Sequence, residues 1–200
     1  MPIDETPITE HPATGFDVEA WLQDAHLPEE STEVYKRADV IGELSALRRQ
    51  IELQREAAAA AERTSGETSE LATLEARYQA LLDTFAGSQL TVYCRAISPD
   101  ERREVRAASE KATAGKDSIE QNAYFGYELL AKAIIAVKPF EGERTPVSWD
   151  AATVRKMENT IGGTQMNAVL QAHQLAQGRM PSVDADFLQK PSGAAAGQGS

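Results

Sequence analysis

The residue types most often used in catalysis and metal binding are few and widely separated in this sequence. The histidines and the single cysteine are His11, His26, Cys94 and His173. No two of them have the four-residue helical spacing or the Cys-x-x-Cys spacing that brings two ligands to one metal ion. We therefore predict no metal or cofactor site, and we interpret Cys94 and His173 as packing residues.

Phosphate-binding and acid–base motifs are also incomplete. Gly115-Lys116-Asp117 ends like a P-loop, but Glu110 occupies the position of the first glycine and Asp117 replaces the hydroxyl residue that binds magnesium. The carboxylates adjoin basic residues, as in Glu101-Arg102-Arg103-Glu104, which is typical of a solvated helix surface rather than of a buried acid–base pair. The sequence thus predicts a protein that is not an enzyme and that works through its surface.

Composition narrows the class of protein further. The 200 residues are 42% hydrophobic and 26% charged, which suits one globular domain or a domain with an appendage. A net charge of −11 disfavours nucleic acid and anionic membranes as partners. No apolar run approaches the ~20 residues of a membrane span, and the first residues lack the apolar region of a secretion signal. With a single cysteine as well, we expect a soluble cytoplasmic protein that binds neither nucleic acid nor membranes.

Two stretches of apolar residues at alternating steps of three and four predict a pair of long helices. A polar break, Thr64-Ser65-Gly66-Glu67, separates them, which predicts an antiparallel coiled-coil hairpin over residues 33–87. Folding the chain at the break places Leu47 opposite Phe85 and Gln54 opposite Tyr78. The apolar residues are Val40, Leu44, Leu47, Ile51, Ala58 and Ala61 in the first helix, and Leu71, Leu74, Tyr78, Leu81 and Phe85 in the second.

The first helix of this hairpin is expected to be longer than the second. It should begin near Ser31 or Thr32, where a hydroxyl can cap it, and end near Arg63. The second helix is expected from residue 68 or 69 to Ala86. Apolar residues at the start of the first helix would extend beyond the second, so the main domain or another copy must cover them. These candidate partner-binding residues are Val34, Val40 and Ile41.

The rest of the chain is predicted to be mainly α-helical with one short strand or β-hairpin. A helical core domain is expected over 88–180, preceded by a disordered N-terminus (1–15) and a short amphipathic segment (16–32), and followed by a flexible tail (181–200). Alternation over residues 90–97 predicts the strand, paired with residues 144–147 or with another protein. Helices are expected over 99–114, over 118–137 with Ile119 buried, from a cap at Ser148 to Ile161, and from a cap at Thr164 onward.

Three aromatic residues lie within one turn of the helix expected over residues 118–137. They are Tyr124, Phe125 and Tyr127, and three rings in one turn are more than a single buried helix face can hold. Either one or two rings belong to the core and the third lies at its boundary, or the rings form a partner-binding patch. The three residues therefore join the candidate partner-binding set.

The chain resembles the tail assembly chaperones of long-tailed actinobacterial phages in the order of several short motifs. Residues 16–22 and 34–40 precede a charged helical hairpin. Residues 92–101 then combine a strand with the start of a helix, where Arg102 stands in place of an aromatic residue of the family. A helix with Asn122 and Tyr124, the pair Trp149-Asp150, a helix pair around Gly162, and residues 183–188 follow in the same order. The resemblance covers about residues 16–190.

The resemblance implies a protein that binds the long helical tape-measure protein in the host cytoplasm. It would keep that protein soluble while tail-tube subunits polymerise around it, and it would be absent from the mature virion. The implied partners are the tape-measure protein and the tail-tube protein. A frameshifted long form of the chain as a further partner, and a homo-oligomer, are left open. The alternatives are a structural virion component, an oligomeric coiled-coil scaffold, or an enzyme whose pocket unites His173 with Cys94.

Overall fold

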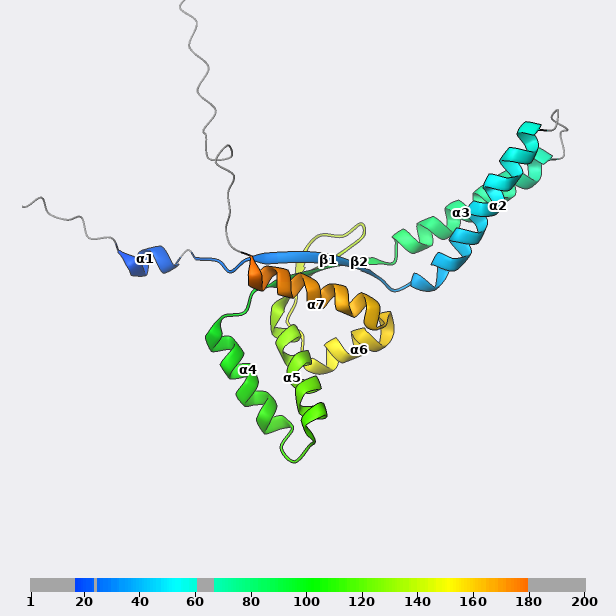
Figure 1. Ribbon diagram of the computed structural model, residues 1–200. Coiled ribbons are helices and arrows are strands. Elements are labelled where there is room, and N and C mark those ends of the chain that lie inside the picture. Colours follow the sequence, from blue (N-terminus) through cyan, green and yellow to red (C-terminus); the bar gives the residue numbers. More distant parts are fainter. Residues whose placement is uncertain (1–16, 24, 61–66, 180–200) are drawn as a thin grey trace, which may run out of the picture.

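The computed structural model describes residues 17–23, 25–60 and 67–179, which are mostly helical with one small antiparallel sheet (Figure 1). The predicted disorder of residues 1–15 and 181–200, residues 64–66 of the polar break, and Ala61 lie outside the described residues. The sheet has the order β1-β2-β3-β4. Its strands are β1 (Glu29–Tyr35), β2 (Gln89–Arg95), β3 (Ile134–Pro139) and β4 (Thr145–Pro146).

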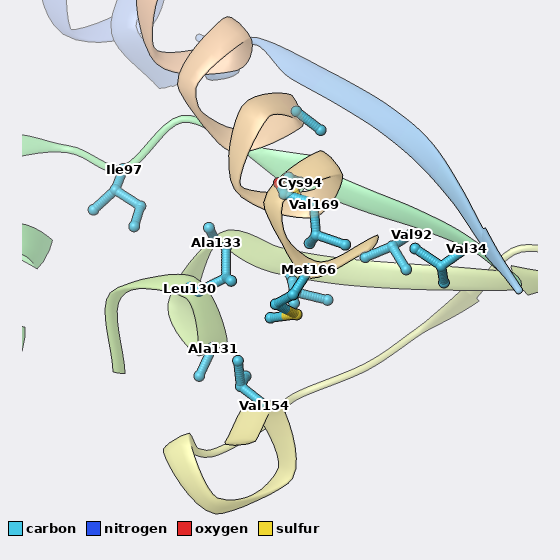
Figure 2. Packing of buried hydrophobic residues seen from close by; sticks show 12 residues of the cluster. Val34, Val92, Cys94, Ile97, Leu130, Ala131, Ala133, Val154, Met166 and Val169 are labelled. Atoms are coloured by element: carbon cyan, nitrogen blue, oxygen red, sulfur yellow. The ribbon is translucent and has the colours of Figure 1, made fainter. Parts of the chain in front are cut away.

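Four helices complete the body of the protein on one side of the sheet. In Figure 1, α7 lies along β1, while α5 and α6 lie beneath it and α4 packs outside α5. Their apolar side chains meet those of the strands in one core, where Val34 and Val92 approach Met166, Val169 and other residues (Figure 2). The helices are α4 (Pro99–Ala112), α5 (Ser118–Ala133), α6 (Ala151–Ile161) and α7 (Gly163–Gly178), and a short α1 (Val18–Gln23) precedes the sheet.

The prediction that a helix begins near Ser31 or Thr32 was wrong, because residues 29–35 form β1. This strand pairs with β2 along its whole length, from Glu29 opposite Arg95 to Tyr35 opposite Gln89. Its many glutamate, serine and threonine residues carry little strand signal of their own. Pairing with β2, about 60 residues further along the chain, therefore determines that this segment is a strand. Local capping signals carry no information about such distant pairing.

The predictions for β2 and for the helix after it were correct only in part. The expected strand over residues 90–97 is β2, but it pairs with β1 and β3, whereas β4 pairs with β3. The helix expected to reach residue 137 ends at Ala133, and β3 follows at once. Ile134 and Val137 fit a helical stripe and a strand equally well, and pairing with β2 selects the strand. Ile119 is 80% exposed, because the first turn of α5 extends away from the sheet.

Helices α2 (Ile41–Ala60) and α3 (Glu67–Ala86) form a pair that projects from the end of the sheet (Figure 1). A short 3₁₀ turn, Ala38–Val40, leads into α2. Arg55 binds Glu75 at 2.6 Å and Arg77 binds Glu43, so both ion pairs join the two helices. The predicted pairing would place Arg77 opposite Arg55, about 18 Å along the axis from Glu43. The Arg77–Glu43 ion pair thus departs from the predicted pairing, whereas the Arg55–Glu75 ion pair lies within two residues of it, and Leu47 and Ile51 are buried as expected.

The ends of the helices follow local chemistry in most cases. The predicted start of a helix at residue 99 is confirmed, and a capping box forms it, because the Ser98 hydroxyl accepts from the Glu101 N–H and the Glu101 carboxylate accepts from the Ser98 N–H. The cap of α6 is Asp150 rather than Ser148, with its carboxylate accepting from the Thr153 N–H at 2.8 Å. The expected Thr164 cap was wrong, since α7 follows Gly162 directly without a side-chain cap.

Gly162 joins α6 to α7 in a backbone conformation that only glycine adopts readily, with φ 82° and ψ 157°. We expect Gly162→Ala to lower the free energy of unfolding by about 1–3 kcal/mol, because a Cβ is strained in this region. The adjacent Gly163 has no positive φ and open space around it, so Gly163→Ala should be neutral or stabilising by less than ~1 kcal/mol. Urea unfolding of both variants checks this, and equal losses would contradict it.

Candidate partner-binding groove

The six predicted partner-binding residues do not form one surface. Val34 and Val40 are 2% and 4% exposed, so the prediction that they face a partner was wrong. Val34 is a core residue on the inner face of β1, and Val40 is buried at the base of the helix pair. The main body thus supplies the cover that these residues need. Ile41 differs, because it is 48% exposed at the start of α2.

The aromatic residues of α5 divide between two sides of the helix. Phe125 faces α4, where the Arg106 guanidinium lies 5.2 Å from the ring centre. Tyr124 and Tyr127 are three residues apart and face α6, as helix geometry requires of that spacing. Tyr124 and Tyr127 therefore lie on one side of α5, whereas Phe125 makes a cation–π contact with α4 within the protein.

A groove of about 570 Å³ lies between α5 and α6. Tyr124 and Tyr127 line it from α5, and Arg155 and Lys156 line it from α6. Ala123 and Ala152, one on each helix, leave the groove open because their side chains are small and exposed. The groove therefore combines aromatic rings and methyl groups, which protein interfaces favour, with charged side chains, which are more typical of the rim of an interface.

Most acidic groups in the groove already have partners within the protein. Glu158, which does not line the groove, accepts from the Tyr127 hydroxyl at 2.5 Å, and this bond raises the pKa of Tyr127. A hydrogen bond to Glu128 likewise raises the pKa of Tyr124. Asp150 accepts from the Thr153 side chain and N–H, which lowers the pKa of its carboxyl.

Two basic residues in the groove, Arg155 and Lys156, differ from these acids in the partners that they have. Within the described part of the chain, neither Arg155 nor Lys156 makes an ion pair or a hydrogen bond through its charged group. Lys116, at the end of the groove, is by contrast bound to Glu120 at 2.6 Å. A partner that enters the groove therefore meets two positive charges whose counterions it can supply.

Cys94 and His173 are both buried, and each contacts a backbone carbonyl. His173 Nδ1 lies 3.1 Å from the Arg95 carbonyl oxygen, and burial lowers the pKa of the imidazole. Cys94 Sγ lies 3.8 Å from the Val169 carbonyl oxygen, and burial raises the pKa of the thiol to about 12. Neither side chain lines the groove. This arrangement is typical of packing residues rather than of a nucleophile and its base.

The buried thiol gives a direct chemical prediction. With a pKa of about 12, only about one Cys94 thiol in ten thousand is ionised at pH 8. We expect a chromogenic thiol reagent to leave the native protein unmodified for hours and to titrate one thiol within minutes in denaturant. Rapid modification of the folded protein would show that Cys94 is accessible.

Two further features are absent from the described residues. Among residues 17–23, 25–60 and 67–179, no three His, Cys, Asp or Glu side chains lie close enough to hold a metal ion. No described helix combines the length and the apolar character that crossing a membrane requires.

Comparison with known proteins identified no related protein. No protein-family model, curated protein or solved structure matches this chain. The geometry of the groove and the residues around it are therefore the basis for a functional proposal.

Proposed function

We propose that the protein is a tail assembly chaperone of a long-tailed phage, which binds the tape-measure protein and keeps it soluble while the tail tube polymerises. The α5–α6 groove is the observation that carries this proposal. A groove between two helices, lined by tyrosine rings and alanines, can receive the apolar side chains of an amphipathic client helix. The order of sequence motifs shared with such chaperones supports the same function.

The charge of the protein fits this role. A tape-measure helix exposes a long apolar stripe that would aggregate unless it is covered. Many copies of a protein with net charge −11 would coat that helix and repel one another, so that the coated complex stays soluble. Weak binding at each site, repeated along one client, gives avidity yet allows tube subunits to displace the copies in turn.

This function places the protein in the host cytoplasm during assembly and outside the mature virion. The tail-tube protein is then a second partner, because it must replace the chaperone on the client. A frameshifted long form of the same chain would extend the coat with a further segment. The protein has no enzymatic reaction in this scheme, and the groove serves as a binding site only.

Filling the groove tests the proposal. We expect Ala152→Arg, which adds a long side chain to an exposed position in the groove, to reduce co-purification of the tape-measure protein at least tenfold. The matched control is Ala107→Arg on α4, also exposed and outside the groove, which should bind the client as the natural protein does. Both variants should have unchanged melting temperatures. Equal client recovery with both variants would exclude the groove as the client site.

A structural virion component or an oligomeric scaffold is the second candidate. The exposed Ile41 and Leu53 on α2 favour it, because apolar side chains on a projecting helix suit packing against another copy. Mass spectrometry of purified virions separates the two functions. A chaperone is absent from virions, whereas a structural protein is present at a fixed copy number.

A further inference from the structure

The short helix α1 carries an apolar face that stays largely exposed. Val18, Trp21 and Leu22 lie three and four residues apart, so they share one side of the helix. These side chains are 53%, 62% and 54% exposed, respectively. An amphipathic helix normally buries such a face, so the exposed face of α1 is suited to binding another surface.

Acidic residues border this apolar face. At 100° per residue, Asp17 and Glu19 lie on its two flanks, and Ala20 lies on the opposite side of the helix. The Asp17 carboxylate accepts from the Ala20 N–H at 3.0 Å, so it caps the helix. Within the described part of the chain, the Glu19 carboxylate has neither an ion pair nor a hydrogen bond. The complementary surface is therefore apolar with a basic residue at its side.

The α5–α6 groove combines these two properties. Tyr124 and Tyr127 provide aromatic rings on its α5 side, and α6 provides Arg155 and Lys156. Both basic residues lack ion pairs within the described residues, whereas the acids beside them already bind other groups of the protein. With its apolar face on the rings, α1 would bring Glu19 to these two positive charges.

Two other hollows in the described residues suit α1 less well. The hollow between α3 and the turn from β3 to β4 is lined by two acids and by no basic residue, so it would repel Glu19. A second hollow, of about 270 Å³ beside β3, contains Arg95 and Lys132. Both of these already bind Glu101, at 2.5 Å and 3.8 Å. Charge therefore favours the α5–α6 groove as the binding site for α1.

The chain before β1 directs α1 away from the groove of its own copy. The Pro28 carbonyl accepts from the Ala96 N–H at 2.8 Å, which extends the pairing of β1 with β2 by one residue. The chain therefore continues in the direction of the strand, and α1 lies beyond the start of β1, well apart from α5 and α6 (Figure 1). In this position α1 is open to the groove of a second copy.

We infer that α1 of one copy binds the α5–α6 groove of a second copy, with its apolar face on the tyrosine rings and Glu19 beside Arg155 and Lys156. Each copy carries one α1 and one groove, so the copies join head to tail. The contact is weak, because a six-residue helix buries less than the ~1,000 Å² of a stable interface. A client helix that binds the same groove would displace α1, and this last step alone rests on the proposed function.

Sedimentation velocity of the full-length protein tests this inference, at concentrations from about 10 μM to about 1 mM. We expect the natural protein to form larger species as its concentration rises. Leu22→Asp places a charge in the apolar face and should weaken self-association at least tenfold. The matched control, Ala20→Asp, adds the same charge on the opposite side of α1 and should self-associate as the natural protein does. A natural protein that stays monomeric, or equal self-association of both variants, would overturn the inference.

A mixture of two variants shows which surfaces meet. Leu22→Asp keeps the groove and loses the apolar face, whereas Ala152→Arg keeps the apolar face and fills the groove. Neither variant alone should self-associate, but the mixture should form dimers and no larger species. A mixture that stays monomeric would show that α1 and the groove do not bind each other.

Client recovery separates this inference from the proposed function. Leu22→Asp should co-purify with the tape-measure protein at least as well as the natural protein does, because its groove is intact and open. If the mixture dimerises but Ala152→Arg still recovers the client, the groove binds α1 and is not the client site. If the natural protein is monomeric and Ala152→Arg loses the client, the proposed function stands and this inference is wrong.

Discussion

Replacing Val34 with Asp is expected to unfold the protein. Val34 is 2% exposed and belongs to the core that β1 and β2 share with α7 (Figure 2). A carboxylate at this position would lose its hydration without gaining a partner, which should lower the free energy of unfolding by about 4 kcal/mol or more. Domains of this size have total stabilities of about 5–15 kcal/mol, so little folded protein would remain at 37 °C.

The matched variant is Ile41→Asp. Ile41 was predicted to belong to the same surface as Val34, but it is 48% exposed. Its replacement should change stability by less than ~1 kcal/mol, because the carboxylate keeps most of its water. Circular dichroism during thermal unfolding measures both variants. If Val34→Asp unfolds no earlier than Ile41→Asp, then β1 does not pack as the fold requires.

The second large effect is expected at the ion pair between β2 and α4. Arg95 binds Glu101 through two nitrogens, one of them 2.8 Å from Oε2, and each side chain is only 22% exposed. Glu101 also caps α4 through the Ser98 N–H, and Lys132 approaches it at 3.8 Å. The bond to Arg95 is the main cause of a Glu101 pKa of about 2. Glu101→Gln should therefore lower stability by about 2 kcal/mol at pH 7.

The pH dependence of this effect has a defined sign. The Glu101 pKa falls from its ordinary 4.5 to about 2 on folding, so the ionised carboxylate favours the folded state. That contribution is complete above pH ~4.5, is lost as the pH falls, and is gone below pH ~2. The stability difference between the natural protein and Glu101→Gln should close over this range. Urea unfolding at several pH values measures it.

Glu104→Gln is the control for the pH-dependent unfolding of Glu101→Gln. Glu104 is exposed on the same helix and makes no ion pair within the described residues. Its replacement should shift stability by less than ~0.5 kcal/mol and leave the pH dependence unchanged. Identical pH curves for Glu101→Gln and Glu104→Gln would contradict the assigned role of the Arg95–Glu101 pair.

The sequence predicted those elements whose signals are local. The start of α4 was correct because Ser98, Pro99 and Glu101 form a cap within four residues. The end of α3 at Ala86 and the burial of Leu47 and Ile51 also follow from signals within one segment. By contrast, β1 depends on β2 beyond an intervening helix pair, and a single sequence gives no measure of such pairing.

The groove was predictable on one side only. Tyr124 and Tyr127 share a helix face by their spacing of three, which also separates them from Phe125. The other side of the groove is formed by α6, which follows α5 in the sequence only after β3 and β4. No local sequence pattern links Arg155 or Lys156 of α6 to α5. Predicting both sides of the groove requires the tertiary fold.

The most direct test of the proposed chaperone function measures the soluble fraction of the tape-measure protein in cells that do or do not express this chain. The proposal predicts that the client is almost wholly insoluble alone and becomes several-fold more soluble with the natural protein, with the gain lost for Ala152→Arg and kept for Ala107→Arg. A client that is equally soluble without this chain, or equally insoluble with it, would contradict the proposal.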